Sequence, residues 1–205
     1  MSAILSIGMG YLIGCISPSA WISRKKHVDL KQEGTKNLGA TNTALVLGKA
    51  AGIFVLVFDI AKSFFSYKLA RLLFPHLRIA GILACIGAIL GHCFPVFMHF
   101  QGGKGLAAFG GLILAYNPWF FLAVVIPGII LMLIFNTGVV APMYGCIIFP
   151  ILVGVFSRNL ADTLAVLVAT SIIFMTHLSN FRRAKEKKDV VKTDEFVTRV
   201  FGKKK

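Results

Sequence analysis

A glycine-rich turn with a single lysine lies between two apolar segments of the chain. It reads Gly102-Gly103-Lys104-Gly105 and closes the segment 92–105, HCFPVFMHFQGGKG. Successive glycine amides can form a concave nest that points N–H groups at an anion, and a lysine ammonium adds positive charge. The turn lacks the GxxxxGK[ST] spacing of a P-loop. We therefore expect a phosphate site at the edge of a membrane, against the alternative of a flexible turn from which the lysine reaches the surface.

A second polar segment, residues 34–42 (GTKNLGATN), carries hydroxyl, carboxamide and ammonium groups close together. Three of its side chains are suited to binding a phosphate or a carbonyl oxygen: Thr35, Lys36 and Asn37. Thr41 and Asn42 are good N-cap residues for a following helix, and capping is expected to account for one of the two. The remaining groups exceed what a connection between helices needs, so we interpret the segment as a second part of the site.

The third polar segment is HLSNFRR, residues 177–183. His177 and Asn180 are three residues apart, so they share one face if the last helix continues this far. Arg182 and Arg183 either contribute to the site or anchor the helix at the membrane surface, and we expect one of them to be an anchor.

Among the ionisable residues in or beside apolar segments, three more are candidates for the site: His92, Asp59 and Lys62. His92 is either an interfacial hydrogen-bonding residue or, with Pro95 between it and the glycine turn, folds back over the site. Asp59 and Lys62 are three residues apart and can pair on one helix face. Charges at membrane depth are usually paired or functional, and here a structural pair is favoured slightly over a catalytic one.

The elements that must position these groups are membrane-spanning helices. Hydrophobic residues make up 57% of the 205 residues, more than in a typical soluble domain. About 20 apolar helical residues span the hydrocarbon core of a membrane. We therefore predict an all-α integral membrane protein with about seven transmembrane helices (five to seven), in which 106–116 is too short to span alone and is tilted or half-crossing. The apolar runs are 3–23, 50–73, 79–98, 106–116, 118–135, 138–156 and 160–178.

Positive charge is concentrated in three parts of the chain. Of the 22 Lys and Arg residues, six lie in 24–49, ten lie in the C-terminal tail, and Lys104 lies in the glycine turn. The positive-inside rule places these parts in the cytoplasm and the N-terminus outside, which requires an odd number of spans. We expect a membrane domain, 1–180, and a basic cytoplasmic tail, 181–205, near anionic headgroups. The net charge of +14 is thereby explained without nucleic acid as a partner.

Small residues predict where helices approach each other. Gly10-x-x-x-Gly14 and Gly87-x-x-x-Gly91 favour close helix–helix packing. The four cysteines lie in or beside apolar segments and show no Cys-x-x-Cys or Cys/His spacing. We therefore expect neither a disulfide framework nor a metal site.

Together, the three polar segments resemble those of the bacterial acyl-phosphate-dependent glycerol-3-phosphate acyltransferases, the PlsY-type family. The family patterns are Ser-Gly-Asn-x-Gly-Ala-Thr-Asn for GTKNLGATN, His-x-Phe/Tyr-Pro-Val-Phe…Lys-Gly-Gly-Lys-Gly for HCFPVF…QGGKG, and His-x-x-Asn-x-x-Arg for HLSNFRR. The resemblance covers nearly the whole chain and keeps the order and spacing of the motifs. It implies a multi-pass enzyme of the bacterial cytoplasmic (inner) membrane whose active site opens to the cytoplasm.

The reaction implied by this resemblance is transfer of a fatty acyl chain from acyl phosphate to the 1-hydroxyl of glycerol 3-phosphate, the first step of phospholipid synthesis. The products are lysophosphatidic acid and phosphate, and no cofactor, coenzyme A or acyl carrier protein is needed. By resemblance, Lys104 and the amides of Gly102, Gly103 and Gly105 hold the phosphate of the acyl phosphate, and Lys104 also stabilises the leaving group. His92 matches a family histidine that orients or deprotonates the attacking hydroxyl, although a substrate phosphate oxygen can take that proton instead. Family positions that shape the site and bind the second phosphate are matched by Asn37, Asn42, His177, Asn180 and Arg183. The loop that contains Asn37 and Asn42 also contains Thr35, Lys36 and Thr41.

Four positions depart from the family patterns. Thr35 stands in place of serine and keeps the hydroxyl, Lys36 replaces a small glycine, and Gln101 replaces a lysine. No arginine follows the first loop, where the chain has Leu45 among apolar neighbours. Lys36 is a candidate to supply the lost charge. These changes affect substrate affinity and activity more than the fold.

Two other function classes remain as alternatives. One is a catalytically altered paralogue that binds phospholipid or an anion, or uses a different acceptor. A lipid-binding protein does not need all of Lys104, His92, His177 and Asn180, which favours the enzyme. The other is a transporter, whose broken midplane helices and central ionisable residues are largely missing here.

Overall fold

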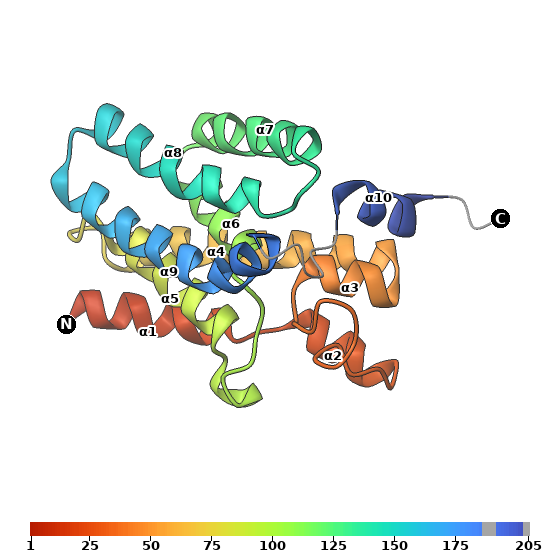
Figure 1. Ribbon diagram of the computed structural model, residues 1–205. Helices are drawn as coiled ribbons and strands as arrows, with labels where there is room; N and C mark the ends of the chain where they lie inside the picture. Colours follow the sequence, from red (N-terminus) through yellow and green to blue (C-terminus); the bar gives the residue numbers. More distant parts are fainter. Residues whose placement is uncertain (186–191, 203–205) are drawn as a thin grey trace.

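The protein is built from helices, as the predicted all-α class requires. The structure, a computed structural model, describes the backbone of residues 1–185 and 192–202 and the side chains of residues 1–182 and 192–202. Most of the long helices lie side by side, and the helix of residues 193–201 lies on the opposite side of the molecule from the N-terminus (Figure 1). The elements within the described residues are α1 (Ser2–Gly14), α2 (Pro18–Lys25), α3 (Ala40–Leu47), α4 (Lys49–Leu73), α5 (Ala80–Cys93), η1 (Val96–Met98), α6 (Leu106–Tyr116), α7 (Pro118–Ile134), α8 (Val140–Ser157), α9 (Leu160–Lys185) and α10 (Thr193–Phe201).

Five stretches of the described chain are long and apolar enough to cross a membrane: Ser2–Lys25, Lys49–Leu73, Ala80–Met98, Val140–Ser157 and Leu160–Arg182. The apolar helices α6 and α7 are shorter, so the range of five to seven spans stands. α6 coincides with the predicted short run. It ends where Asn117 caps α7, accepting a hydrogen bond from the N–H of Trp119 at 2.8 Å, and Pro118 takes the first position of α7.

The first span is not the continuous helix that the apolar run 3–23 suggests. α1 ends at Gly14, and α2 begins at Pro18. A proline disfavours the helical conformation of the residue that precedes it. Here that residue is Ser17, which caps α2 by accepting a hydrogen bond from the N–H of Ala20 at 3.4 Å. The Ser-Pro pair therefore interrupts the helix. The carbonyl groups of the last turn of α1 are left without helical partners.

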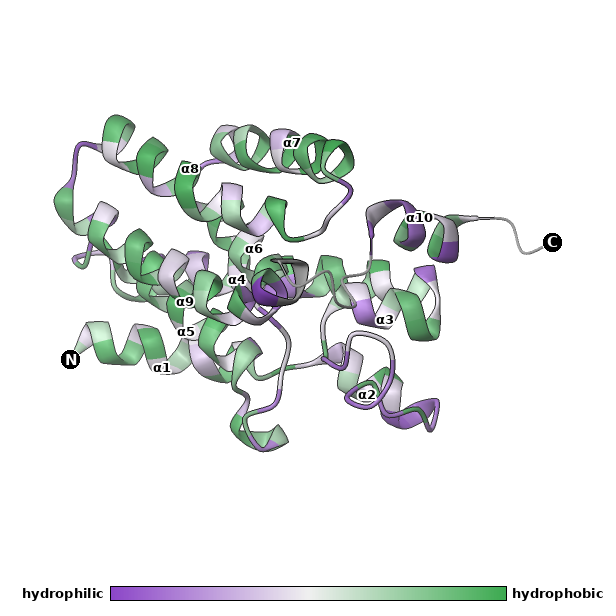
Figure 2. Cartoon of the chain, in the orientation of Figure 1, coloured by the Kyte–Doolittle hydropathy of each residue, from purple (hydrophilic) through white to green (hydrophobic). Residues whose placement is uncertain are grey.

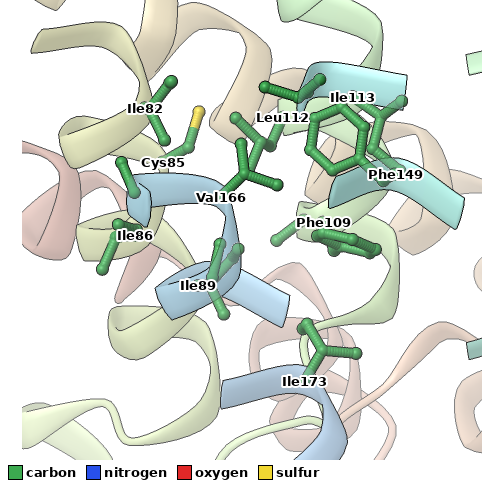
Figure 3. Packing of buried hydrophobic residues seen from close by; sticks show 14 of the residues in the cluster. Ile82, Cys85, Ile86, Ile89, Phe109, Leu112, Ile113, Phe149, Val166 and Ile173 are labelled. Atoms are coloured by element: carbon green, nitrogen blue, oxygen red, sulfur yellow. The ribbon is translucent and has the colours of Figure 1, made fainter. Parts of the chain in front are cut away.

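α5 is the central helix of the molecule. All its residues except Leu83 and Leu90 are buried, as expected of a helix that is apolar on every side. Helices α1, α4, α6 and α9 all contact it. Its isoleucines belong to one core cluster with Phe109 of α6, Phe149 of α8 and Val166 of α9 (Figure 3).

α1 packs against α5 through glycines, which confirms the predicted close packing. A Cβ added at Gly10 would lie 1.9 Å from the carbonyl oxygen of Ala84. A Cβ at Gly14, Gly87 or Gly91 would likewise meet backbone atoms of the facing helix. Close backbone approach of this kind stabilises helix pairs in lipid, where apolar burial alone gives no driving force.

Hydrophilic residues gather around α2, the α2–α3 connection and the end of α9, whereas α1, α7 and α8 are mostly hydrophobic (Figure 2). The N-terminus lies away from this polar end. Near it, the Ser2 hydroxyl lies 3.0 Å from Nε2 of His76. Arg78 forms a 2.9 Å ion pair with Asp162, and this interaction raises the pKa of the Arg78 guanidinium above its usual value.

Part of the predicted basic tail forms a helix, α10, which contacts α3 and α7. The Thr193 hydroxyl donates to the carbonyl of Met132 at 3.2 Å, and the N–H of Asp194 donates to Oδ1 of Asn136 at 2.9 Å. Residues 186–191 and 203–205 of the tail lie outside the described residues.

Candidate active site

The polar segment 34–42, called the first loop below, is held together by the fully buried side chain of Asn42. Its Oδ1 accepts a hydrogen bond from the N–H of Thr35 at 2.6 Å. Its Nδ2 donates to the carbonyls of Leu30 and Asn37, both at 2.8 Å. Both amide hydrogens are therefore used inside the loop. Asn42 shapes the site through the loop backbone.

Neither Thr41 nor Asn42 caps the following helix, so that prediction is wrong. α3 begins at Ala40 with Gly39 as its N-cap residue, which puts both side chains in the first turn. The helix starts earlier than expected because Oδ1 of Asn37 accepts a hydrogen bond from the N–H of Gly39 at 2.9 Å, a local turn typical of asparagine. Thr41 is exposed on the first turn.

Lys36 and its neighbours form the outer part of this loop. Nδ2 of Asn37 donates to the Thr35 hydroxyl at 2.9 Å, so the two predicted site side chains lie together. Lys36 is exposed and has a φ of 56°. The left-handed region costs a non-glycine residue about 1–2 kcal/mol. The backbone thus suits the glycine of the family pattern, and this chain has a charged side chain there instead.

The glycine turn folds back onto the end of α5. The N–H groups of Gly102 and Gly103 donate to the carbonyls of Cys93 and His92, both at 3.1 Å. These amides satisfy carbonyls that the end of the helix leaves unpaired. The prediction that they point at an anion is therefore wrong in this geometry, because their hydrogens are already in use. Lys104 is the charged group of the turn.

Side chains are excluded at the three glycines of the turn. A Cβ at Gly102 would lie 2.0 Å from the carbonyl oxygen of His92, and one at Gly103 would lie 2.2 Å from His92 Nε2. Gly105 has a φ of 84°, and a Cβ there would lie 2.9 Å from Cys93 Sγ. The turn thus lies directly against the imidazole, which agrees with the hypothesis that His92 lies beside the site.

The end of α9 supplies the third part of the site. The helix continues past residue 178, so His177 and Asn180 lie on one helix as expected. Lys104 Nζ donates to Oδ1 of Asn180. The Thr176 hydroxyl donates to the Lys104 carbonyl at 2.8 Å. Thr176 was not predicted, and its only sequence signal is that it precedes Asn180 by one helical turn.

The buried imidazole of His177 has a defined hydrogen-bond role. Its Nδ1 lies 2.9 Å from the carbonyl oxygen of Ile173. A carbonyl only accepts, so Nδ1 carries the hydrogen, and Nε2 of a neutral ring is an acceptor. His177 is therefore suited to accept a hydrogen bond from a hydroxyl group at the site.

Direct contacts join the three polar segments. The N–H of Leu38 donates to the Gly102 carbonyl at 3.3 Å, which links the first loop to the glycine turn. Lys104 then links the turn to Asn180 on α9. The side chain of Arg183, also predicted to belong to the site, lies outside the described residues.

A buried charged cluster lies beside the glycine turn. Asp59 and Lys62 of α4 form the predicted pair, with 2.8 Å between Oδ1 and Nζ. His92 Nδ1 lies 3.0 Å from Lys62 Nζ and 3.3 Å from Asp59 Oδ1. The spacing of Asp59 and Lys62 along α4 predicted their ion pair, but it could not predict that His92 of α5 contacts both residues. Among the described residues, no group of three or more His, Cys, Asp or Glu side chains is placed to hold a metal ion.

Comparison with protein families gives a match over most of the chain. The family model described as glycerol-3-phosphate acyltransferase matches residues 4–187. The glycerol-3-phosphate acyltransferase of Lactiplantibacillus plantarum is 39% identical over 190 residues, covering 90% of this chain and 89% of that protein. The enzyme of the same name from Enterococcus faecalis is 34% identical over 197 residues, covering 90% and 89%.

Solved structures with the same arrangement of helices are also known. The crystal structure of PlsY (YgiH), an integral membrane glycerol 3-phosphate acyltransferase, in its glycerol 3-phosphate form matches with a TM-score of 0.86 at 27% identity. The match covers 96% of this chain and 99% of that one. The lysophosphatidic acid form of the same protein matches with a TM-score of 0.85 at the same identity and coverage.

Proposed function

Because this chain belongs to the glycerol-3-phosphate acyltransferase family, we propose that it transfers a fatty acyl group from an acyl phosphate to the 1-hydroxyl of sn-glycerol 3-phosphate. The hydroxyl oxygen forms an ester bond to the acyl carbon while the bond from that carbon to the phosphate oxygen breaks. The hydroxyl proton passes to a base, and the products are lysophosphatidic acid and inorganic phosphate. The acceptor and the product agree with the forms in which PlsY was crystallised.

The electrostatics of this reaction explain the need for a cationic site. Two dianionic phosphates about 6 Å apart repel each other by roughly 10 kcal/mol at an effective dielectric constant near 20. Positive charge and hydrogen-bond donors must offset that repulsion before both substrates can bind. Lys104 and Lys36 supply positive charge in two of the joined segments. Arg183 is proposed to supply more from α9.

The contact between Lys104 and Asn180 is the observation that carries the proposal. It brings the lysine of one motif to the asparagine of another, 76 residues away in the chain. We assign to Lys104 the phosphate of the acyl phosphate, whose developing charge the ammonium stabilises as the phosphate leaves. His177 and Asn180 are assigned to the acceptor substrate, together with the hydroxyl of Thr35 and the carboxamide of Asn37.

The remaining predicted residues have supporting roles in this proposal. Asn42 fixes the first loop. Gly102 and Gly103 let the turn approach His92 without a steric clash, and Gly105 does the same beside Cys93. Exposed Thr41 and Lys36 lie at the rim of the site, where they contact the incoming acceptor.

The location follows from the helices and the charge. We propose that the protein is a multi-pass protein of the bacterial cytoplasmic membrane and that its polar end faces the cytoplasm, where glycerol 3-phosphate is dissolved. The acyl chain of the donor then lies among the apolar helices. Neither coenzyme A nor acyl carrier protein is required.

A donor comparison tests this function. Purified protein in lipid vesicles is given labelled glycerol 3-phosphate with palmitoyl phosphate, palmitoyl coenzyme A or palmitoyl acyl carrier protein. We expect labelled lysophosphatidic acid with the acyl phosphate alone. Product from the coenzyme A or carrier-protein thioester at a comparable rate would contradict the proposed donor. An absence of product from all three would favour the paralogue with another acceptor.

A further inference from the structure

Three buried ionisable side chains lie together beside the glycine turn, and the family resemblance gives a role only to His92 among them. Asp59, Lys62 and His92 are 1%, 4% and 7% exposed. Burying charge is costly unless hydrogen bonds and opposite charges compensate for it. The hydrogen-bond pattern of the cluster therefore has to account for every polar hydrogen.

Three oxygen atoms and the ring of His92 surround the ammonium group of Lys62. Its Nζ lies 3.0 Å from the carbonyl oxygens of both Gly14 and Ile16, and 2.8 Å from Oδ1 of Asp59. An ammonium group has three N–H donors and no acceptor. The two carbonyls belong to the interruption between α1 and α2, so Lys62 binds the groups that the broken helix leaves unpaired.

This accounting determines which nitrogen of His92 carries a hydrogen. Nδ1 lies 3.0 Å from Lys62 Nζ, from which it can accept a hydrogen, and 3.3 Å from Oδ1 of Asp59, to which it can donate one. Three hydrogens cannot serve four acceptors, and the carboxylate carries the negative charge that an ammonium hydrogen bond prefers. We therefore assign the hydrogens of Lys62 to the three oxygens, which leaves donation from Nδ1 to Asp59. The neutral ring then has its hydrogen on Nδ1, and Lys62 and Asp59 balance each other in charge.

The other nitrogen of the ring faces the glycine turn. His92 Nε2 lies where a Cβ at position 103 would come within 2.2 Å of it. Any residue except glycine at position 103 would therefore cover Nε2. With its hydrogen on Nδ1, the ring has an unprotonated acceptor nitrogen on the side of the turn.

We propose that Asp59 and Lys62 are positioning residues for acyl transfer. Lys62 binds the carbonyl groups at the break between α1 and α2, and Asp59 holds the ring of His92 in the form that carries its hydrogen on Nδ1. Nε2 then accepts a hydrogen bond from the attacking hydroxyl of glycerol 3-phosphate and orients it toward the acyl carbon. The inference rests on the proposed function for the identity of the hydroxyl. The arrangement of the buried cluster itself does not depend on that function.

Nitrogen NMR of the histidine ring tests the arrangement without any need for activity. The protein is labelled with ¹⁵N in its histidine rings, and the His92 signals are assigned by their loss in His92→Gln. At mildly alkaline pH we expect Nδ1 of His92 to be protonated and Nε2 to be unprotonated. In the double variant Asp59→Asn with Lys62→Gln this preference should be lost. A wild-type ring with its hydrogen on Nε2 would overturn the inference.

Kinetics of the same double variant test the role in catalysis. The double change is used because either single change leaves an unpaired buried charge, whereas the pair of neutral amides does not. Thermal unfolding first establishes that the variant is folded. We expect kcat to fall by about 100-fold, the lower range for a positioned acid–base group, with little change in KM for either substrate.

The matched control is Lys68→Gln, a change of the same residue type on an exposed part of the same helix. It should leave kcat and the His92 signals unchanged. A folded double variant with the wild-type kcat would overturn the positioning role. If the wild type forms no lysophosphatidic acid, the proposed function fails, and the NMR measurement still decides whether Asp59 sets the protonation of His92.

Discussion

Asn42 shows how one side chain can determine the backbone of a functional loop. Its carboxamide binds the N–H of Thr35 and the carbonyls of Leu30 and Asn37. The same loop reaches the glycine turn through the N–H of Leu38. A polar residue buried in this way is conspicuous in sequence as part of a polar motif. Its structural role becomes visible only when its partners are known.

Replacing Asn42 with alanine should therefore destabilise the protein. The change leaves buried backbone groups without partners, each at a cost of about 1–3 kcal/mol, so the melting temperature should fall clearly in detergent. Acyl transfer should fall with it, because the first loop is no longer held against the turn. Thr41→Ala is the matched control, since Thr41 is the exposed neighbour. Equal melting temperatures for the two variants would contradict the structural role of Asn42.

At the scale of elements, the contact of α1 with α5 depends on glycines. Gly10 and Gly14 bring the α1 backbone against Ala84 and Ala88 of α5. This contact holds the end of α1 where its unpaired carbonyls meet Lys62. The position of the first helix is thereby connected to the buried cluster beside the site.

Gly10→Ala is predicted to disrupt this packing. Its Cβ would lie 1.9 Å from a backbone oxygen, and overpacking of this kind typically costs about 1–3 kcal/mol. Gly8→Ala is the control on the same helix, because nothing lies within 4 Å of its Cβ position. Thermal unfolding in detergent compares the two. A melting temperature of Gly10→Ala at or above that of Gly8→Ala would show that α1 does not pack as described.

The positions of the helices followed from the apolar runs and their lengths, but the interruptions of the helices did not. The runs 50–73 and 138–156 agree closely with α4 and α8. The first run hid the break at Ser17-Pro18, because the residues on both sides are apolar enough for one span. Likewise, Thr41 and Asn42 looked like caps, and Asn37 set the start of α3 earlier through a local hydrogen bond. The residue at which a helix starts or breaks depends on local hydrogen bonds, and the composition of the segment does not reveal them.

At the scale of the whole molecule, the polar segments and the N-terminus lie at different ends of the helices (Figures 1 and 2). The charge distribution predicts that the polar end is cytoplasmic. An odd number of crossings is required for this orientation. Five crossings satisfy this requirement, and so do seven if the shorter helices α6 and α7 are counted as two additional crossings.

Cysteine accessibility can test this orientation. A cysteine at the exposed position Lys36 should react with a membrane-impermeant maleimide in inside-out vesicles and not in intact cells. A cysteine at exposed His76 should show the opposite pattern, because this residue lies beside the N-terminal helix. The wild-type chain measures the background from its own four cysteines. The reverse labelling pattern would contradict the predicted topology.

Most residues of the candidate site were visible in the sequence because polar groups are rare in apolar surroundings. His177, Asn180, Lys104 and the glycine turn were all identified in this way, and the structure brings Lys104 to Asn180. The sequence did not show which of the polar atoms already form hydrogen bonds within the protein. The amides of Gly102 and Gly103 bind the end of α5, and this could not be inferred from a glycine pattern alone.

The most direct test of the central claim is acyl transfer from palmitoyl phosphate to labelled glycerol 3-phosphate, measured in vesicles for the wild type, Lys104→Ala and the exposed control Lys68→Ala. We expect lysophosphatidic acid from the wild type and from Lys68→Ala. The rate for Lys104→Ala should be at least about 100-fold lower, as for the loss of a group that stabilises developing charge. A folded Lys104→Ala variant with the wild-type rate, or a folded wild type that forms no product beside an active control enzyme, would contradict the account.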